Sequence, residues 1–183
     1  MKKLLLLFCC IIGLNTNIYA QEALTYSKVI QVEGISKNVI YTTLLDWIQT
    51  NYRGVKNDSQ LSDKEAGYIM KDAAFAFIKK DMMYQCWDGL VVYKMKFQIK
   101  DGRFKVELLN FIHETLRKDC TPRMDMGLIT DAIDYGKGGA LYKGPNNKMW
   151  KELQSMCEKK ANELFSTLEN IDFNKFSTTD DDW

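Results

Sequence analysis

The stretch over residues 91–112 (VVYKMKFQIKDGRFKVELLNFI) constrains the fold of this chain more than any other. Apolar and polar residues alternate along both of its halves, which is the two-residue period of a half-buried β-strand. Asp101 and Gly102 separate the halves, and an Asp-Gly pair between alternating runs is a strong signal for a β-hairpin. The sequence therefore predicts a hairpin with a type I′ turn in which Lys100 faces Arg103.

This register divides the hairpin into two faces, because directly opposed residues of an antiparallel pair share one face. One face is predicted to point into the core, with the pairs Ile99–Phe104, Phe97–Val106, Met95–Leu108 and Val91–Ile112. The other face carries five basic residues, namely Lys94, Lys96, Lys100, Arg103 and Lys105. Three apolar residues are predicted to share that basic face: Val92, Leu109 and Phe111. A partner chain, a ligand or, as we expect, the segment 114–147 has to cover them.

The N-terminus has the three parts of a secretory signal peptide. Two lysines precede an apolar segment over residues 4–14, and the tripeptide IYA, which ends at Ala20, is an acceptable cleavage site. The apolar run is shorter than the roughly 20 residues of a transmembrane helix. Cys9 and Cys10 raise the alternative of a lipoprotein, but the large residues before them do not fit a lipid-attachment box. We expect residues 1–20 to be removed and the protein to be periplasmic or secreted.

The remainder has the length and composition of one soluble domain. Residues 21–172 fall close to the usual single-domain size of about 100 to 150 residues. The full chain has 25 basic and 24 acidic residues, so its net charge of +1 gives no reason to expect nucleic acid as a partner. No second apolar segment of spanning length follows, and no transmembrane segment is expected in the mature chain. The polar, acidic residues 173–183 are predicted to form a disordered tail.

The pattern before the hairpin predicts strands and one helix. Residues 25–33 alternate like a strand, and Ser36 is a good N-cap for an amphipathic helix that extends to about Asn51. Residues 55–61 form a weaker strand candidate, and residues 66–77 form a further strand or strand pair.

The segments on either side of the hairpin are less regular. The strand that leads into the hairpin is expected to begin at Tyr84 or Cys86, with an irregularity at Asp88-Gly89. After the hairpin the period is lost, and residues 114–147 are predicted to form a long loop with a short helical turn around residues 128–135.

A long helix is predicted to close the domain, from Asn146 or Asn147 to about Ile171, because its apolar residues recur every three or four positions. The resulting order is strand, helix, four strands, helix. This order predicts an α+β fold, a single antiparallel sheet with two helices packed on one face.

In the order of its elements and in several motifs, the chain resembles a family of bacterial secreted proteins that is described as a domain of unknown function with a TBP-like fold. The resemblance rests on YSKVIQVEGISKNVIY from Tyr26, on DKEAGYI from Asp63 and on YKMKFQIKDGRFKVELLNF from Tyr93. It covers about residues 26–113. The resemblance implies an exported protein with a TBP-like fold and no assigned activity, and it supplies no catalytic residue.

Two sequence features resemble parts of catalytic or ligand-binding sites, but the residues around them do not support such a role. His113 is the only histidine, and the cysteines lack C-x-x-C spacing, so no metal site is predicted. As a general base His113 would need a nucleophile and an orienting carboxylate, so we interpret it as an ordinary strand-end residue. The run GKGG at residues 136–139 lacks the hydroxyl residue and the preceding strand of a phosphate-binding loop, and we interpret it as a surface loop. No catalytic residue and no cofactor are predicted.

Three cysteines remain after removal of residues 1–20, and in an oxidising compartment an odd number suggests one disulfide and one free thiol. Extending the hairpin ladder backwards places Cys86 opposite Arg117, three positions before Cys120. Cys157 falls in the apolar stripe of the closing helix. The sequence therefore predicts a Cys86–Cys120 bridge and a buried, reduced Cys157.

The sequence leaves three hypotheses for function open. The first is a non-enzymatic binding domain of the cell envelope, whose partner is an envelope protein or an anionic ligand at the five basic residues. The second is an envelope hydrolase with its site in residues 114–147, and the third is a structural accessory subunit of an envelope assembly. For the basic residues a plain solvated surface also remains open, because lysines on an exposed sheet discourage edge pairing without binding anything.

Overall fold

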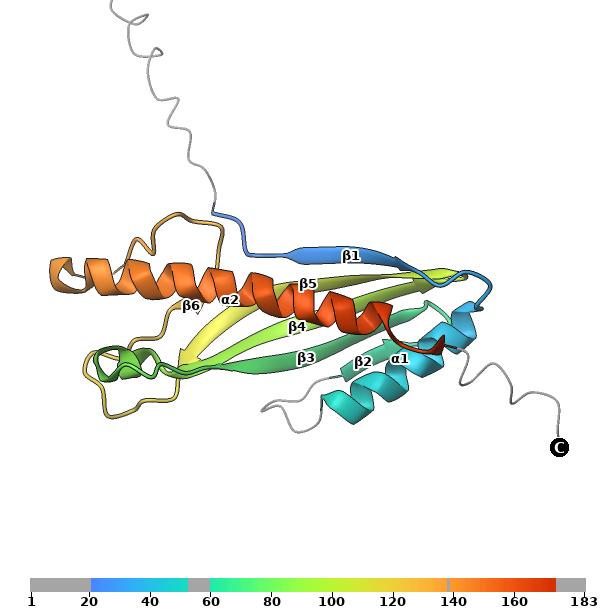
Figure 1. The fold of residues 1–183 in the computed structure, drawn as a ribbon, viewed down its shortest axis with the longest axis horizontal. Coiled ribbons are helices and arrows are strands. Elements are labelled where there is room, and N and C mark those ends of the chain that lie inside the picture. Colours follow the sequence, from blue (N-terminus) through green and yellow to red (C-terminus); the bar gives the residue numbers. More distant parts are fainter. Residues whose placement is uncertain (1–20, 53–59, 138, 174–183) are drawn as a thin grey trace, which may run out of the picture.

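The structure, a computed structural model, describes residues 21–52, 60–137 and 139–173. Its elements in chain order are β1 (Tyr26–Gln31), α1 (Lys37–Asn51), β2 (Gln60–Asp63), β3 (Tyr68–Phe77), the 3-10 helix η1 (Met82–Trp87), β4 (Gly89–Lys100), β5 (Arg103–Thr115), β6 (Gly127–Leu128), the 3-10 helix η2 (Ala140–Tyr142) and α2 (Lys143–Glu169). Within these described residues the strands form one antiparallel sheet of six strands, in the order β1-β5-β4-β3-β2 with β6 paired to β5. Both long helices cover one face of the sheet (Figure 1), which confirms the predicted α+β fold. We call the opposite, helix-free side the outer face.

The two helices form where the sequence predicts them. Helix α1 has Ser36 as its N-cap, and the Ser36 Oγ accepts a hydrogen bond from the N–H of Val39 at 3.4 Å. The face of α1 that contacts the sheet is apolar and buried. Helix α2 buries the predicted stripe of Trp150, Leu153, Cys157, Ala161, Leu164 and Leu168. These apolar stripes and the inward residues of β4 and β5 make up the hydrophobic core.

The hairpin of β4 and β5 keeps the predicted register over the half next to its turn. Lys100 pairs with Arg103, and the pairing continues in step to Lys94 and Leu109. The predicted inward residues of this half are buried, from Met95 to Ile99 on β4 and from Phe104 to Leu108 on β5. The alternation of apolar residues was therefore sufficient to specify this part of the sheet.

The turn itself differs from the predicted type I′. That turn needs a positive φ at both central residues, whereas only Gly102 has one, at 71°. A tertiary contact accounts for the difference, because the carboxylate of Asp101 accepts a hydrogen bond from the N–H of Lys37 at 2.7 Å. Gly102 also donates its N–H to the carbonyl of Ile35 at 2.9 Å. The turn is thus shaped by the start of α1, which is docked against it.

A β-bulge interrupts the other half of the hairpin. Between Val92 and Lys94 the register shifts by one residue, and the extra residue lies on β5 near Asn110, which has a φ of 57°. Beyond the bulge, each β5 side chain points to the face of the sheet opposite to the predicted one. Phe111 is fully buried and Ile112 is 39% exposed.

The bulge corrects three predictions. Val91 pairs with His113 rather than with Ile112. Phe111 points into the core rather than onto the basic face, and the irregularity is not at Asp88-Gly89. The physical reason is the two-residue period of a strand, since one inserted residue exchanges the two faces.

The chain before β4 is not a strand, although the sequence predicts one from Tyr84 or Cys86. It forms η1, whose N-cap Asp81 accepts a hydrogen bond from the N–H of Met83 at 3.0 Å. Strand β4 begins only at Gly89. Local capping by the short Asp side chain favours the helical turn here over continued alternation.

The predicted loop over residues 114–147 is partly regular. Strand β5 extends to Thr115, β6 forms at Gly127–Leu128, and η2 and the start of α2 occupy residues 140–147. The helical turn predicted around residues 128–135 is absent, because the backbone there pairs with other segments: Ala23 bridges Thr130, and Ile129 donates its N–H to the carbonyl of Phe111.

The remaining boundary predictions have mixed outcomes. Strand β2 lies at Gln60–Asp63, and most of the predicted strand over residues 55–61 falls outside the described residues. Phe173, assigned to the tail, is 5% exposed and its ring lies 5.8 Å from that of Phe104, so it belongs to the core. Residues 1–20 and 174–183, where the signal peptide and the rest of the tail were predicted, also lie outside the described residues.

Candidate functional site

Three of the five basic residues on the hairpin form ion pairs on the outer face. Lys94 lies 2.7 Å from Asp72 of the neighbouring strand β3. Lys96 and Lys105 both contact Glu107, at 2.8 and 2.7 Å. Hydrogen bonds from the two lysines, Lys105 first, lower the pKa of the Glu107 carboxyl. Two carboxylates, Asp72 and Glu107, therefore offset two of the three positive charges within the sheet itself.

The other two basic residues lie next to the turn and are differently placed. Within the described part of the chain, Lys100 and Arg103 have no carboxylate within ion-pair distance. They line a pocket of about 260 Å³ together with Val29, Gln98, Phe104 and Lys105. The structure thus divides the predicted basic site into an ion-paired part, where Lys96 and Lys105 share Glu107, and a small end at Lys100 and Arg103 without ion pairs.

An apolar row crosses the outer face beyond the bulge. Ala74 on β3 pairs with Val92 on β4, Val92 pairs with Ile112 on β5, and Ile112 pairs with Leu128 on β6. Directly paired residues share a face, so the four side chains lie side by side across four strands. We call this set the apolar row.

The apolar row is open to solvent at one end. Ile112 is 39% exposed and Leu128 is 46% exposed. Residues 114–147 therefore leave Ile112 and Leu128 uncovered, so the expected cover of the outer face is incomplete. Their backbone pairs edge-on with β5 through β6, which adds Leu128 to the face instead of shielding it.

Only part of this surface follows from the pattern of the sequence. Val92 and Leu109 were assigned to the outer face, whereas Ile112 was assigned to the core and Leu128 to the loop. Asn110 was the available signal for the bulge, because Asn adopts a positive φ more readily than most residues. No pattern pointed to the pairing of β6 with β5.

His113 is a structural residue in this arrangement. It is fully buried and its ring stands edge-on to that of Phe77. The Nδ1 atom accepts a hydrogen bond from the N–H of Met126 at 3.2 Å, and Nε2 lies 2.9 Å from the carbonyl oxygen of Trp87. Burial lowers the pKa of the imidazole. Both nitrogens are thus engaged by the backbone and neither faces a substrate-sized space.

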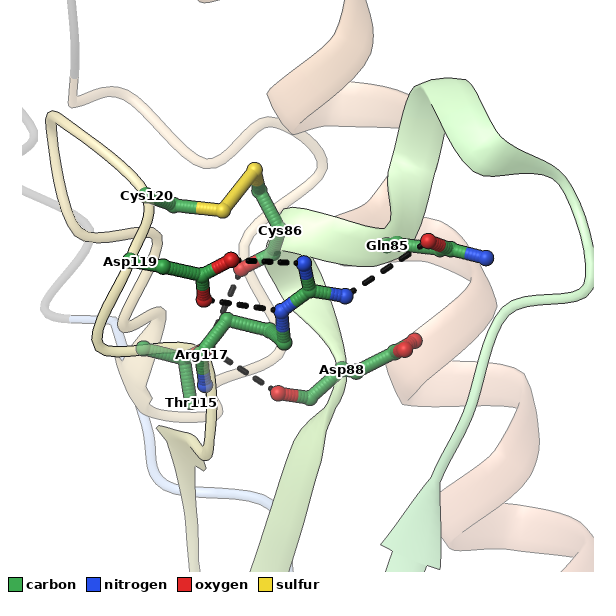
Figure 2. The surroundings of a disulfide bond; sticks show 7 residues. All are labelled: Gln85, Cys86, Asp88, Thr115, Arg117, Asp119 and Cys120. Atoms are coloured by element: carbon green, nitrogen blue, oxygen red, sulfur yellow. Dashed lines mark hydrogen bonds and ion pairs between the residues drawn. A yellow bond between two sulfur atoms is a disulfide. The ribbon is translucent and has the colours of Figure 1, made fainter.

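A disulfide joins η1 to the segment after β5, as Figure 2 shows. The bridge links Cys86 and Cys120, with Cα atoms 5.8 Å apart, which is the pairing expected from the sequence. The guanidinium of Arg117 lies between Asp119, at 2.8 Å, and the side-chain oxygen of Gln85, at 3.5 Å. The bridge and these contacts hold the start of the 114–147 segment against η1.

Cys157 and Asp125 also have structural roles. Cys157 is free and fully buried, and burial raises the pKa of its thiol to about 12. The Asp125 carboxylate accepts the N–H of Thr115 at 2.8 Å and pairs with Arg123. Among the residues that the structure describes, no three His, Cys, Asp or Glu side chains are grouped to hold a metal ion. No helix in the same residues is long and apolar enough to cross a membrane.

Comparisons with known proteins agree with this fold. Over 82% of this chain and 95% of the other, the structure is similar to a TBP-like protein from Parabacteroides distasonis, with a TM-score of 0.58 and 18% identity. It is also similar to a DUF4468 family protein from Bacteroides ovatus, with a TM-score of 0.59 and 16% identity over 84% of this chain and 90% of that one. No curated protein matches the sequence. Residues 26–114 match the family described as a domain of unknown function (DUF4468) with TBP-like fold, and this part of the chain therefore belongs to that family.

Proposed function

We propose that this chain is an exported, non-enzymatic interaction domain of the bacterial cell envelope, which binds a protein partner through the outer face of its sheet. The observation that carries the proposal is the apolar row, whose members Ile112 and Leu128 remain 39% and 46% exposed. Contiguous apolar surface of this kind is characteristic of interaction sites, whereas single exposed apolar residues are not.

The shape and charge of the outer face favour a protein as the occupant. Neighbouring strands lie about 4.8 Å apart, so a row across four strands extends over roughly 14 Å along the sheet surface. The ion pairs of Lys94 and Lys96 border it with polar groups, which is the arrangement of an interface core and its rim. Lys100 and Arg103 at the far end favour a partner that presents carboxylates beside its apolar contact.

Export is supported by two independent features. The first is the predicted signal peptide, and the second is the Cys86–Cys120 bridge, since disulfides persist mainly in oxidising compartments. Mass spectrometry of the protein from envelope fractions is expected to find Gln21 at the N-terminus. A mature form that begins at a lipidated Cys9 or Cys10 would instead make the protein a membrane-anchored lipoprotein.

Photocrosslinking in intact cells tests the binding proposal. A photoreactive phenylalanine analogue is placed at Leu128 or at Ile112, and the matched control carries it at Lys159 on α2, whose side chain is 74% exposed. We expect a discrete adduct with one identified envelope protein from the first two positions and none from the control. Charge reversal of Lys100 and Arg103 together is expected to reduce the adduct yield severalfold.

Other results of this experiment contradict the proposal. An adduct with a second copy of this chain shows self-association, and an adduct with phospholipid shows membrane contact. Equal labelling from Lys159, or the absence of any adduct at both row positions, removes the outer face as the binding surface.

A further inference from the structure

A second surface feature lies apart from the outer face, at the end of the sheet where α2 begins. An open pocket of about 570 Å³ lies there, lined by residues 122–126, by Tyr135 and Lys137, by residues 139–142 and by Asn146. We call it the loop pocket. None of its lining residues belongs to the apolar row or to the five basic residues of the hairpin. The loop pocket is therefore distinct from the outer face that carries the proposed function.

The walls of the loop pocket are apolar and partly fixed. Met124, Met126, Tyr135 and Tyr142 are among the apolar residues that line it. Tyr135 is held in place because its hydroxyl donates a hydrogen bond to the carbonyl of Asp125 at 3.1 Å and its ring lies 5.2 Å from that of Trp150. Met126 is 2% exposed. Concave apolar sites of about 300 to 1,000 Å³ with few polar groups are the usual form of small-molecule sites.

One polar group in the lining of the pocket is incompletely bonded. Asn146 is 5% exposed, and its Oδ1 has no hydrogen-bond partner. Its Nδ2 reaches the carbonyl of Lys137 only at 3.4 Å. Buried polar side-chain atoms nearly always have a partner, so an acceptor of this kind beside a pocket indicates a missing donor. A ligand N–H or O–H is the donor that this position suits.

The electrostatics of the loop pocket favour an anion. Lys137 is exposed at the rim, and in the described part of the chain no carboxylate pairs with it. The pocket also includes the residues that begin α2, a helix of 27 residues with neither a side-chain N-cap nor an acidic residue in its first turn. The partial positive charge of that helix end is therefore not compensated by the protein. Asp125 lines the pocket as well, but its carboxylate is paired with Arg123 at 3.0 Å.

We infer that the loop pocket binds a small amphipathic anion, whose apolar or aromatic body contacts Met124, Met126 and Tyr142. Its anionic group lies toward Lys137 and the N-terminus of α2. A hydrogen-bond donor on its body pairs with Asn146 Oδ1. The three requirements come from separate observations, the apolar walls, the uncompensated positive charge and the unpaired acceptor.

The dye 1-anilinonaphthalene-8-sulfonate meets all three requirements, since it has an aromatic body, a sulfonate and an N–H donor. We expect saturable binding of one dye per protein, measured as enhanced fluorescence on titrating the full mature chain. Lys137→Glu is expected to weaken binding about tenfold, with an effect that falls as salt is raised. Ala140→Phe, at an exposed position of the lining, is expected to abolish binding by filling the space.

Matched controls separate this site from general dye adsorption. Lys159→Glu makes the same charge change about 20 Å further along α2 than Asn146 and is expected to leave the dye affinity unchanged. Asn146→Leu is expected to weaken binding about fivefold with little change in the melting temperature, because its acceptor is unpaired in the free protein and its donor makes only the 3.4 Å contact with Lys137. N-phenyl-1-naphthylamine, which lacks the sulfonate, is expected to bind about tenfold more weakly than the sulfonated dye.

Three results overturn the inference. Binding that is unaffected by both Lys137→Glu and Ala140→Phe places the dye elsewhere. Equal affinity for the neutral and sulfonated dyes shows that the pocket does not select an anion. Failure of the folded chain to bind either dye shows that the pocket holds no amphipathic ligand of this size.

Discussion

The Nε2 atom of His113 lies 2.9 Å from the carbonyl oxygen of Trp87, while Nδ1 of the same ring accepts the N–H of Met126. This pair of contacts fixes the tautomer, because Nδ1 has to be unprotonated to accept a hydrogen bond and Nε2 then carries the proton that it donates. The ring joins β5, the end of η1 and the segment that leads into β6. Only the neutral imidazole satisfies both contacts.

The first prediction concerns the pH dependence of stability. The pKa of His113 is lowered by burial, although the carbonyl of Trp87 and the charges of Asp125 and Glu114 oppose this shift. The unfolded chain then binds a proton more readily than the folded one, so the free energy of unfolding falls as pH drops below the unfolded value of about 6.5. His113 is the only histidine, and an NMR titration of its ring protons reads the pKa without ambiguity.

The variant His113→Phe separates the contribution of His113 to the pH dependence of stability from that of the carboxylates. His113→Phe leaves two buried backbone groups unpaired and is expected to cost about 2 to 4 kcal/mol near neutral pH. In urea unfolding, the difference between the variant and the wild type is expected to shrink as the pH is lowered. A measured imidazole pKa above about 6.5 contradicts the argument.

The second prediction concerns Gly89, where β4 begins against β5. A Cβ atom at this position would lie 2.7 Å from His113 Nε2 and still closer to the carbonyl oxygen of Glu114. Gly89→Ala is therefore expected to lower the free energy of unfolding by more than about 3 kcal/mol, since backbone atoms cannot move aside without breaking the strand pairing. Gly144→Ala is the matched control, because nothing lies within 4 Å of its Cβ. Because Gly144 precedes Pro145, whose ring restricts the residue before it, Gly144→Ala is expected to change the free energy of unfolding by no more than about 1 kcal/mol. Equal losses in both variants contradict the explanation.

Much of the fold follows from periodicity in the sequence. The stripe of α2 from Trp150 to Leu168 and the N-cap Ser36 of α1 were predictable, because helical spacing and capping are local properties. The register next to Lys100 and Arg103 was predictable for the same reason. The type of the hairpin turn was not predictable in this way, because a residue distant in the sequence determines it. The side chain of Asp101 accepts a hydrogen bond from the backbone of Lys37.

The candidate surfaces could be predicted less well than the fold. The apolar row depends on the bulge at Asn110, which exchanges the faces of Phe111 and Ile112 without any change of pattern in the sequence. It also depends on the pairing of Leu128 with Ile112, between segments that alternate only in part. The loop pocket lies between a segment without periodic pattern and the start of α2, and no local pattern in the sequence predicts how that segment packs.

The third prediction concerns the cysteines. The Cys86–Cys120 bridge spans 34 residues, and the chain-entropy model assigns such a loop about 3 to 4 kcal/mol. Cys86→Ser combined with Cys120→Ser is expected to lower the free energy of unfolding by this amount. Cys157 is expected to react with an alkylating reagent only after denaturation, since it is fully buried and its thiol pKa is raised to about 12. Non-reducing peptide mapping checks the connectivity, and a bridge that includes Cys157 contradicts it.

The fourth prediction concerns the bulge on which the apolar row depends. Asn110 has a φ of 57°, a conformation that glycine adopts without strain and that a β-branched residue strongly disfavours. Asn110→Gly is expected to leave the free energy of unfolding within about 0.5 kcal/mol of the wild type, whereas Asn110→Val is expected to lower it by about 1 to 2 kcal/mol. If the bulge instead shifts to relieve the valine, Ile112 returns toward the core and Leu128 loses its neighbour on the outer face. Hydrogen exchange of the β5 amides distinguishes these cases, and a valine variant as stable as the wild type, with unchanged exchange, contradicts a strained bulge at this position.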